Sequence, residues 1–140
     1  SSLMRVGNPN VAIDSELEEE GKWFDFPSIW WTDPDRPMRG KIRSQGTRKY
    51  QAFVRSKTRG LATREQLEER AFEISADGAI ELLADIDNWI DADGNHVAFQ
   101  PEIMRGILHD YDNREVVDFI IRCSDVDNFR VKRSEELEKN

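Results

Sequence analysis

Residues 22–32 read KWFDFPSIWWT, with five large aromatic rings among nine consecutive residues. The run Phe24-Asp25-Phe26 alternates apolar and polar side chains, which is typical of a strand with one buried face. A turn-forming stretch rich in proline and aspartate follows, and then a second short candidate strand. We therefore predict a small antiparallel hairpin or meander over about residues 22–44.

Helical spacing replaces this alternation from about Thr47 onward. Tyr50, Phe53 and Val54 fall on one face of a predicted helix. Gly60 lies just beyond this face and is expected to end the helix.

A second, longer helix is predicted after Thr63. The Thr63 side chain can cap the helix, and Gln66 stands three residues later, which is a capping-box pattern. Gly78 is expected to break or kink this helix. The apolar positions that continue its spacing are Leu67, Ala71, Ile74, Ala79, Leu82, Leu83, Ile86, Trp89 and Ile90.

The second half of the chain predicts further helices. Asp93-Gly94 indicates a tight turn, Pro101 suits the first position of a helix, and Asp112 suits a helix cap. We therefore predict a mainly helical α+β protein, in which the hairpin at about 22–44 is followed by four to five helices.

The pattern also predicts how the chain is divided. Residues 1–15 have little periodicity and are expected to form a flexible arm. Residues 16–131 are expected to form a single globular domain, followed by a charged tail at 132–140.

The composition excludes several classes of protein. Of the 140 residues, 38% are apolar and 34% are charged, and the apolar runs are far shorter than the ~20 residues of a membrane span. The single cysteine excludes a disulfide scaffold, and the first ten residues lack the apolar stretch of a secretory signal. We therefore expect a cytosolic protein.

Charge is distributed unevenly along the chain. Residues 36–64 contain ten Lys or Arg and no Asp or Glu, although the whole chain has a net charge of −8. This segment either meets a polyanion or lies against the acidic remainder of its own domain, or is simply a solvated face. The overall negative charge argues against nucleic acid as the partner.

No pattern of residues predicts catalysis or metal binding. Placing Gly94 at the sixth position of a calcium-binding loop puts Trp89 first and Gln100 twelfth, where oxygen ligands are needed. The two histidines lack zinc-site spacing, and Cys123 follows an apolar helical face that predicts an inert core thiol. We therefore expect no enzymatic activity, no cofactor and no metal.

The aromatic stretch at 22–32 is the strongest candidate for binding. A single domain normally buries such rings in its core, but Trp30 or Trp31 could instead stay exposed as an interaction patch. The sequence leaves both possibilities open.

The second half of the chain also resembles a known kind of protein. Residues 89–102 read WIDADGNHVAFQPE and are followed by Ile107-Leu108, an order similar to that in small tail-region proteins of long-tailed phages and prophages. The stretch SDVDNF at 124–129 and the Lys-Asn ending are similar to the C-terminus of the same family. Gln100 departs from the Ser or Thr usual there, and the tryptophan-rich insert at 29–38 is unusual.

The upstream segments extend this resemblance to about residues 16–140. Gly21-Lys22-Trp23 and residues 41–50 are similar to the family's N-terminal strand region. Members of this family are often described as phage tail assembly chaperones. The resemblance thus implies a non-enzymatic protein that binds the tape measure protein, and it leaves open whether the tail tube protein is a second partner. Such a chaperone would act in the host cytoplasm and be absent from the mature virion.

We expect the partner to be held by aromatic anchors with a charged rim. Two alternatives stay open, namely a structural virion protein of the tail or head–tail connector, and a nucleic-acid-binding module that uses residues 36–64. A homo-oligomer is also compatible with the sequence. The predicted anchors are Trp23, Trp30 and Trp31, and the predicted rim is Arg39, Lys41 and Arg43.

Overall fold

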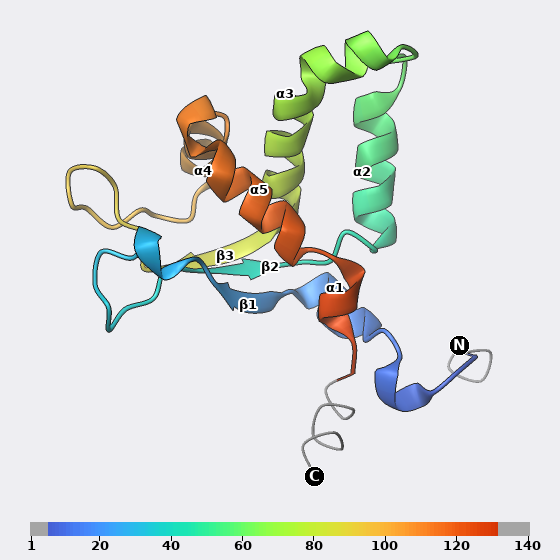
Figure 1. Ribbon diagram of the computed structural model, residues 1–140, viewed down its shortest axis with the longest axis horizontal. Coiled ribbons are helices and arrows are strands. Elements are labelled where there is room, and N and C mark those ends of the chain that lie inside the picture. Colours follow the sequence, from blue (N-terminus) through green and yellow to red (C-terminus); the bar gives the residue numbers. More distant parts are fainter. Residues whose placement is uncertain (1–5, 132–140) are drawn as a thin grey trace.

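The computed structural model describes residues 6–131, and it is an α+β fold built on a three-stranded antiparallel sheet. Figure 1 shows helices α2 to α5 on one side of this sheet. The helices and strands are α1 (Ser15–Glu20), β1 (Lys22–Asp25), β2 (Arg39–Ile42), α2 (Arg48–Thr58), α3 (Arg64–Leu82), β3 (Leu83–Asp87), α4 (Pro101–Leu108) and α5 (Arg114–Cys123). Short 3-10 turns are η2 (Pro9–Val11), η3 (Ser28–Trp30), η4 (Tyr111–Asn113) and η5 (Val126–Phe129).

The predicted hairpin is confirmed by β1 and β2. Lys22 pairs with Ile42 and Asp25 with Arg39, so the two strands run antiparallel over their full length. Strand β2 lies in the middle of the sheet, because β3 pairs with its other edge.

Phe26, the residue that follows β1, lies at the centre of the core. It is 1% exposed, and its ring centroid lies 4.8 Å from that of Phe119 on α5 and 5.5 Å from that of Trp89. These rings join the sheet to the helices above it. The other buried apolar residues of this cluster are Ile42, Ala79, Leu82, Leu83, Met104, Leu108, Val117, Ile120 and Cys123.

The prediction that the long helix reaches residue 90 is wrong. Helix α3 ends at Leu82, and the chain continues directly as β3. Within LADID at 83–87, the run Ala84-Asp85-Ile86-Asp87 alternates between apolar and polar residues, so helical spacing and strand spacing were both compatible with it. Pairing with β2 decides between them, because the strand satisfies the backbone of β2 and buries Leu83.

Local signals at three helix or turn boundaries are confirmed, whereas the cap predicted at Asp112 is wrong, because Asp112 lies inside η4 and Asn113 precedes α5. The Thr63 side chain accepts a hydrogen bond from the Gln66 backbone, and the Gln66 side chain accepts one from the Thr63 backbone. Pro101 opens α4. Gly94 has a φ of +83°, and its N–H donates to the Asp91 carbonyl in the predicted turn.

Gly78 does not break α3, contrary to expectation. It lies buried inside the helix, where a Cβ would come within 2.8 Å of the Tyr50 hydroxyl oxygen on α2. The glycine therefore allows the Tyr50 ring to lie against α3, which a larger residue would prevent.

We expect Gly78→Ala to destabilise the protein by about 1–3 kcal/mol through overpacking, although alanine favours helices by about 1 kcal/mol. Urea unfolding of the single variant and of Gly78→Ala/Tyr50→Phe measures this. Because Tyr50→Phe removes the clashing oxygen, the double variant should recover most of the loss. Equal destabilisation in both variants would contradict the close approach.

Residues 11–14, which belong to the predicted arm, hydrogen-bond to residues 129–131. Asp14 N–H donates to the Phe129 carbonyl, and Val131 N–H donates to the Ala12 carbonyl. The division of the chain at residue 15 stays a prediction, and the predicted tail at 132–140 lies outside the described residues. Within residues 6–131, every helix is too short or too polar to span a bilayer.

Candidate functional site

The face of the sheet turned away from α2–α5 carries mostly polar and charged side chains, and no described helix covers it (Figure 1). The strand register places these side chains in two rows across the sheet. Successive residues of a strand point to opposite faces, so the alternate set, which includes the buried Gly40 and Ile42, faces the core. A register shift between Lys41 and Ile42 turns Leu83 to the core as well, although it lies two residues from Asp85. We call this face the open sheet face, and its residues are Trp23, Lys41 and Asp85 in one row and Asp25, Arg39 and Asp87 in the other.

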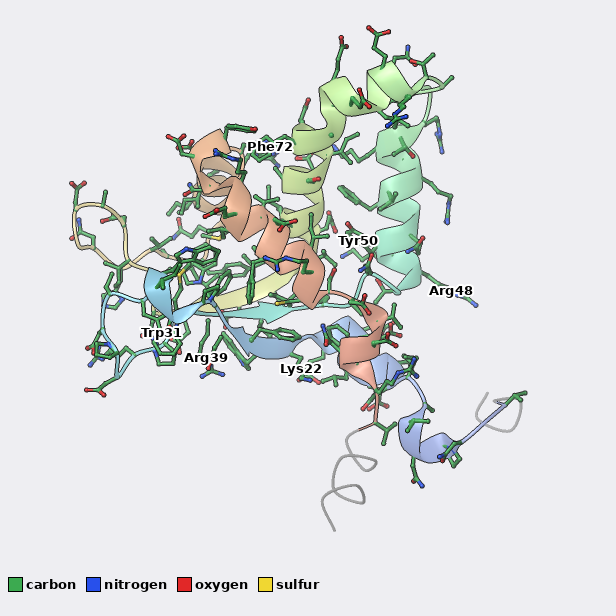
Figure 2. The ribbon with its side chains drawn as sticks, viewed as in Figure 1. Lys22, Trp31, Arg39, Arg48, Tyr50 and Phe72 are labelled. Atoms are coloured by element: carbon green, nitrogen blue, oxygen red, sulfur yellow. The ribbon has the colours of Figure 1, made fainter. Side chains whose placement is uncertain are left out.

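Trp23 is the only aromatic residue of the open sheet face. The Arg39 guanidinium carbon lies 4.8 Å from the centre of the Trp23 ring, which is a cation–π contact. Arg39 Nε also lies 3.4 Å from Asp25 Oδ1. Figure 2 shows Arg39 projecting from the side of the sheet opposite the helices. The indole is therefore held in place while it remains half-exposed.

A hollow of about 410 Å³ opens beside Trp23, between α1 and the sheet. Leu17 and Trp23 supply apolar walls, and Lys41 lies at the rim, where its Nζ is 3.7 Å from Glu20 Oε1. Glu20 is 71% exposed. Because the ion pair is long and its carboxylate is exposed, it contributes little to stability, and Lys41, whose side chain is 26% exposed, can exchange Glu20 for a carboxylate of a partner.

Trp30 and Trp31, the other predicted anchors, lie in the connection between β1 and β2. The Trp30 ring packs against Phe26 and Phe119 at the edge of the core, with centroid distances of 6.0 and 6.1 Å. The Trp31 indole N–H donates to the Phe26 carbonyl at 2.8 Å, which fixes the ring within its own loop. Both tryptophans thus have intramolecular contacts and are half-buried.

Their neighbour Ile29 is instead 86% exposed. It follows Pro27-Ser28, which is a turn signal that could have placed it outside the core. The sequence pattern predicted tryptophans as anchors and did not identify Ile29.

Arg43 does not lie with Arg39 and Lys41. Its Nε donates to the Glu19 carbonyl at 3.1 Å, and its Nη1 donates to the Glu81 carbonyl at 3.2 Å. The guanidinium thereby ties the end of α1 to the end of α3. Of the six predicted residues, the structure places Trp23, Arg39 and Lys41 together.

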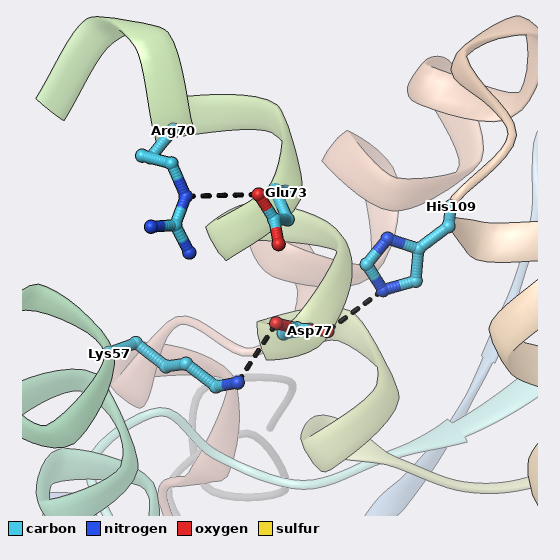
Figure 3. A network of polar contacts seen from close by, with 5 residues as sticks. All are labelled: Lys57, Arg70, Glu73, Asp77 and His109. Carbon is cyan, nitrogen blue, oxygen red and sulfur yellow. Dashed lines mark hydrogen bonds and ion pairs between the residues drawn. The ribbon is translucent and has the colours of Figure 1, made fainter. Parts of the chain in front are cut away.

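A separate polar network joins three helices (Figure 3). Asp77 on α3 accepts from Lys57 Nζ at 3.1 Å and from His109 Nε2 at 2.8 Å. Burial of Asp77 opposes its ionisation, but hydrogen bonds and charges from Lys57 and His109 outweigh this, so the pKa of Asp77 is lowered. The network holds α2 and the end of α4 against α3.

This lowered pKa predicts a loss of stability in acid. A carboxyl whose pKa is lower in the folded state stabilises the fold above its unfolded pKa of about 3.9, and the contribution disappears as the pH falls through the folded pKa. Asp77→Asn should therefore be less stable than the wild type at pH 7, and the difference should shrink towards pH 2.

Urea unfolding between pH 2 and 7 measures this difference. Asp118→Asn is the matched control, because Asp118 is 69% exposed and, within residues 6–131, its ion-pair partner is Arg122 on the same helix. A difference that stays constant with pH would contradict a role for the ionised Asp77 carboxylate.

Cys123 is buried, and burial raises the pKa of its thiol to about 11. The thiolate that nucleophilic chemistry needs is therefore disfavoured. Among the described residues, no three His, Cys, Asp or Glu side chains form a group able to hold a metal ion.

Comparisons of the chain with protein-family models, with curated proteins and with solved structures gave no match. The function is therefore inferred from the residues of the open sheet face and from the sequence resemblance described above.

Proposed function

We propose that this protein is a phage tail assembly chaperone that binds the tape measure protein and keeps it soluble in the host cytoplasm. The observation that carries the proposal is the cluster of Trp23, Arg39 and Lys41 on the open sheet face. Sequence resemblance to the tail-region proteins of long-tailed phages supplies the identity of the partner.

The open sheet face has the chemistry that reversible protein binding needs. A half-exposed indole beside a hollow offers a large rigid surface for an apolar side chain of a partner. The two cations of β2 lie beside exposed Asp85 and Asp87, so the face presents both signs of charge for orienting a partner. A net charge of −8 also favours solubility, which a chaperone needs in order to keep its complex with the tape measure protein in solution.

Co-expression with the tape measure protein of the same phage tests the proposal. We expect the tape measure protein to be insoluble alone, and to be soluble and recovered in complex with this chain when the two are produced together. If it stays insoluble and no complex is recovered, the proposed function is wrong.

Mass spectrometry of purified virions separates this function from that of a structural component. A chaperone leaves before the tail is complete, so virions should lack this chain. A constant number of copies per particle would instead favour a structural protein of the tail or of the head–tail connector.

A further inference from the structure

Helix α2 has one face that packs against α3. The Tyr50 ring lies over Gly78, and Lys57 reaches Asp77 with Nζ 3.1 Å from Oδ2 (Figure 3). Phe53 stacks beside Tyr50 at 5.8 Å between ring centroids. At about 100° per residue, these side chains fix which side of α2 is turned inward.

The opposite side of α2 carries three arginines in line. Arg48, Arg55 and the helix-ending residue Arg59 are spaced at i, i+7 and i+11, which places them within about 40° of one another around the helix. We call these three residues the arginine stripe. All are exposed, and Figure 2 shows Arg48 pointing away from the rest of the molecule.

The arginine stripe lacks the local neutralisation found on other helices. Arg64 pairs with Glu68, Arg70 with Glu73, and Arg122 with Asp118, in each case three or four residues away on the same helix. Helix α2 contains no Asp or Glu, and within residues 6–131 no ion pair involves a residue of the arginine stripe. Like charges one turn apart, as at Arg55 and Arg59, destabilise a helix slightly.

From this geometry we infer that the arginine stripe is a docking surface for an acidic α-helix of a partner protein. The stripe is straight and about 16 Å long, which matches carboxylates repeated along one face of a helix. The small residues Ala52 and Ser56 lie exposed between and beside the arginines, so a partner helix can approach closely. The planar guanidinium group of arginine can donate two parallel hydrogen bonds to the two oxygens of a carboxylate, and its charge is opposite to that of the carboxylate.

Nucleic acid fits this surface less well. Tyr50 and Phe53, the aromatic residues of α2, are turned towards α3 and cannot stack on bases. The first turns of α3, which lie beyond the end of α2 in Figure 1, carry exposed Glu65, Glu68 and Glu69 that would repel a long polyanion. A single acidic helix is narrower than a nucleic-acid duplex, so it can lie along the arginine stripe at a greater distance from these glutamates.

Labelled helical peptides test the inference without the tape measure protein, so its failure would leave the proposed function untouched. One peptide of about 18 residues carries Glu along one face at i, i+4, i+7 and i+11, and its control carries Gln at those positions. Fluorescence anisotropy should show the Glu peptide binding at least about tenfold more tightly than the Gln peptide at low salt, with the preference falling as salt rises.

Two triple variants with equal charge locate the site. Arg48→Ala/Arg55→Ala/Arg59→Ala should weaken Glu-peptide binding about tenfold or more, whereas Arg64→Ala/Arg70→Ala/Arg122→Ala should leave it near the wild-type value. Circular dichroism checks that both variants fold. Equal losses in both variants, equal binding of the two peptides, or tighter binding of a duplex DNA of about 16 base pairs would each overturn the inference.

Discussion

Replacing Phe26 with alanine is expected to lower the free energy of unfolding by about 3–5 kcal/mol, which is the range for emptying a fully buried aromatic site. Phe26 is 1% exposed and packs between Trp30, Trp89 and Phe119, so its ring joins the sheet to α5. Loss of the ring leaves a cavity at the point where these two layers meet. Urea unfolding, followed by tryptophan fluorescence, measures the change.

Ile29→Ala is the matched control for this prediction. Ile29 lies three residues away and is 86% exposed, so its truncation should change stability by less than about 0.5 kcal/mol. A small effect of Phe26→Ala, or a similar effect of both substitutions, would contradict the assignment of Phe26 to the core.

Replacing Trp23 with alanine is expected to weaken binding of the tape measure protein at least about 30-fold, as for an interface hot spot of about 2 kcal/mol. The indole is half-exposed on the open sheet face, and the Arg39 guanidinium is its described ring partner. Stability should therefore fall by no more than about 1 kcal/mol. Titration of the purified chain with a soluble segment of the tape measure protein measures the affinity.

Tyr111→Ala provides a control of similar chemistry at a different place. Tyr111 is 61% exposed and lies against Phe72 of α3, away from the open sheet face. Its loss should leave the affinity within about twofold of the wild type, since truncation of residues outside an interface is close to neutral. If Trp23→Ala binds as tightly as Tyr111→Ala, the partner does not use the open sheet face.

Local sequence signals predicted those parts of the fold that depend on interactions between residues close together in the sequence. The capping box at Thr63 and Gln66, the turn at Gly94 and the proline that opens α4 each depend on residues within one helical turn. The alternation after Lys22 likewise predicted a strand that could pair with its near neighbour in sequence, and β1 and β2 do pair.

The candidate site was predicted only in part, because helical or strand spacing does not say which aromatic ring the core will enclose. Trp23 and Trp30 lie in the same short stretch, yet Trp30 packs against Phe119 from the far end of the chain while Trp23 faces outward. Arg43 is four residues from Arg39, but its guanidinium donates hydrogen bonds to backbone carbonyls of α1 and α3 instead of lying beside Arg39. Such contacts come from segments that only folding brings together.

By itself, the sequence determined the paired strands β1 and β2, the first residues of α3 and α4, and the segregation of basic residues into 36–64, since each follows from neighbouring residues or from composition. The tertiary structure alone decided that residues 83–87 form β3 and that Gly78 makes room for Tyr50. The physical reason is that LADID suits either a helix or a strand. The free edge of β2, which offers backbone hydrogen bonds and a place to bury Leu83, selects the strand.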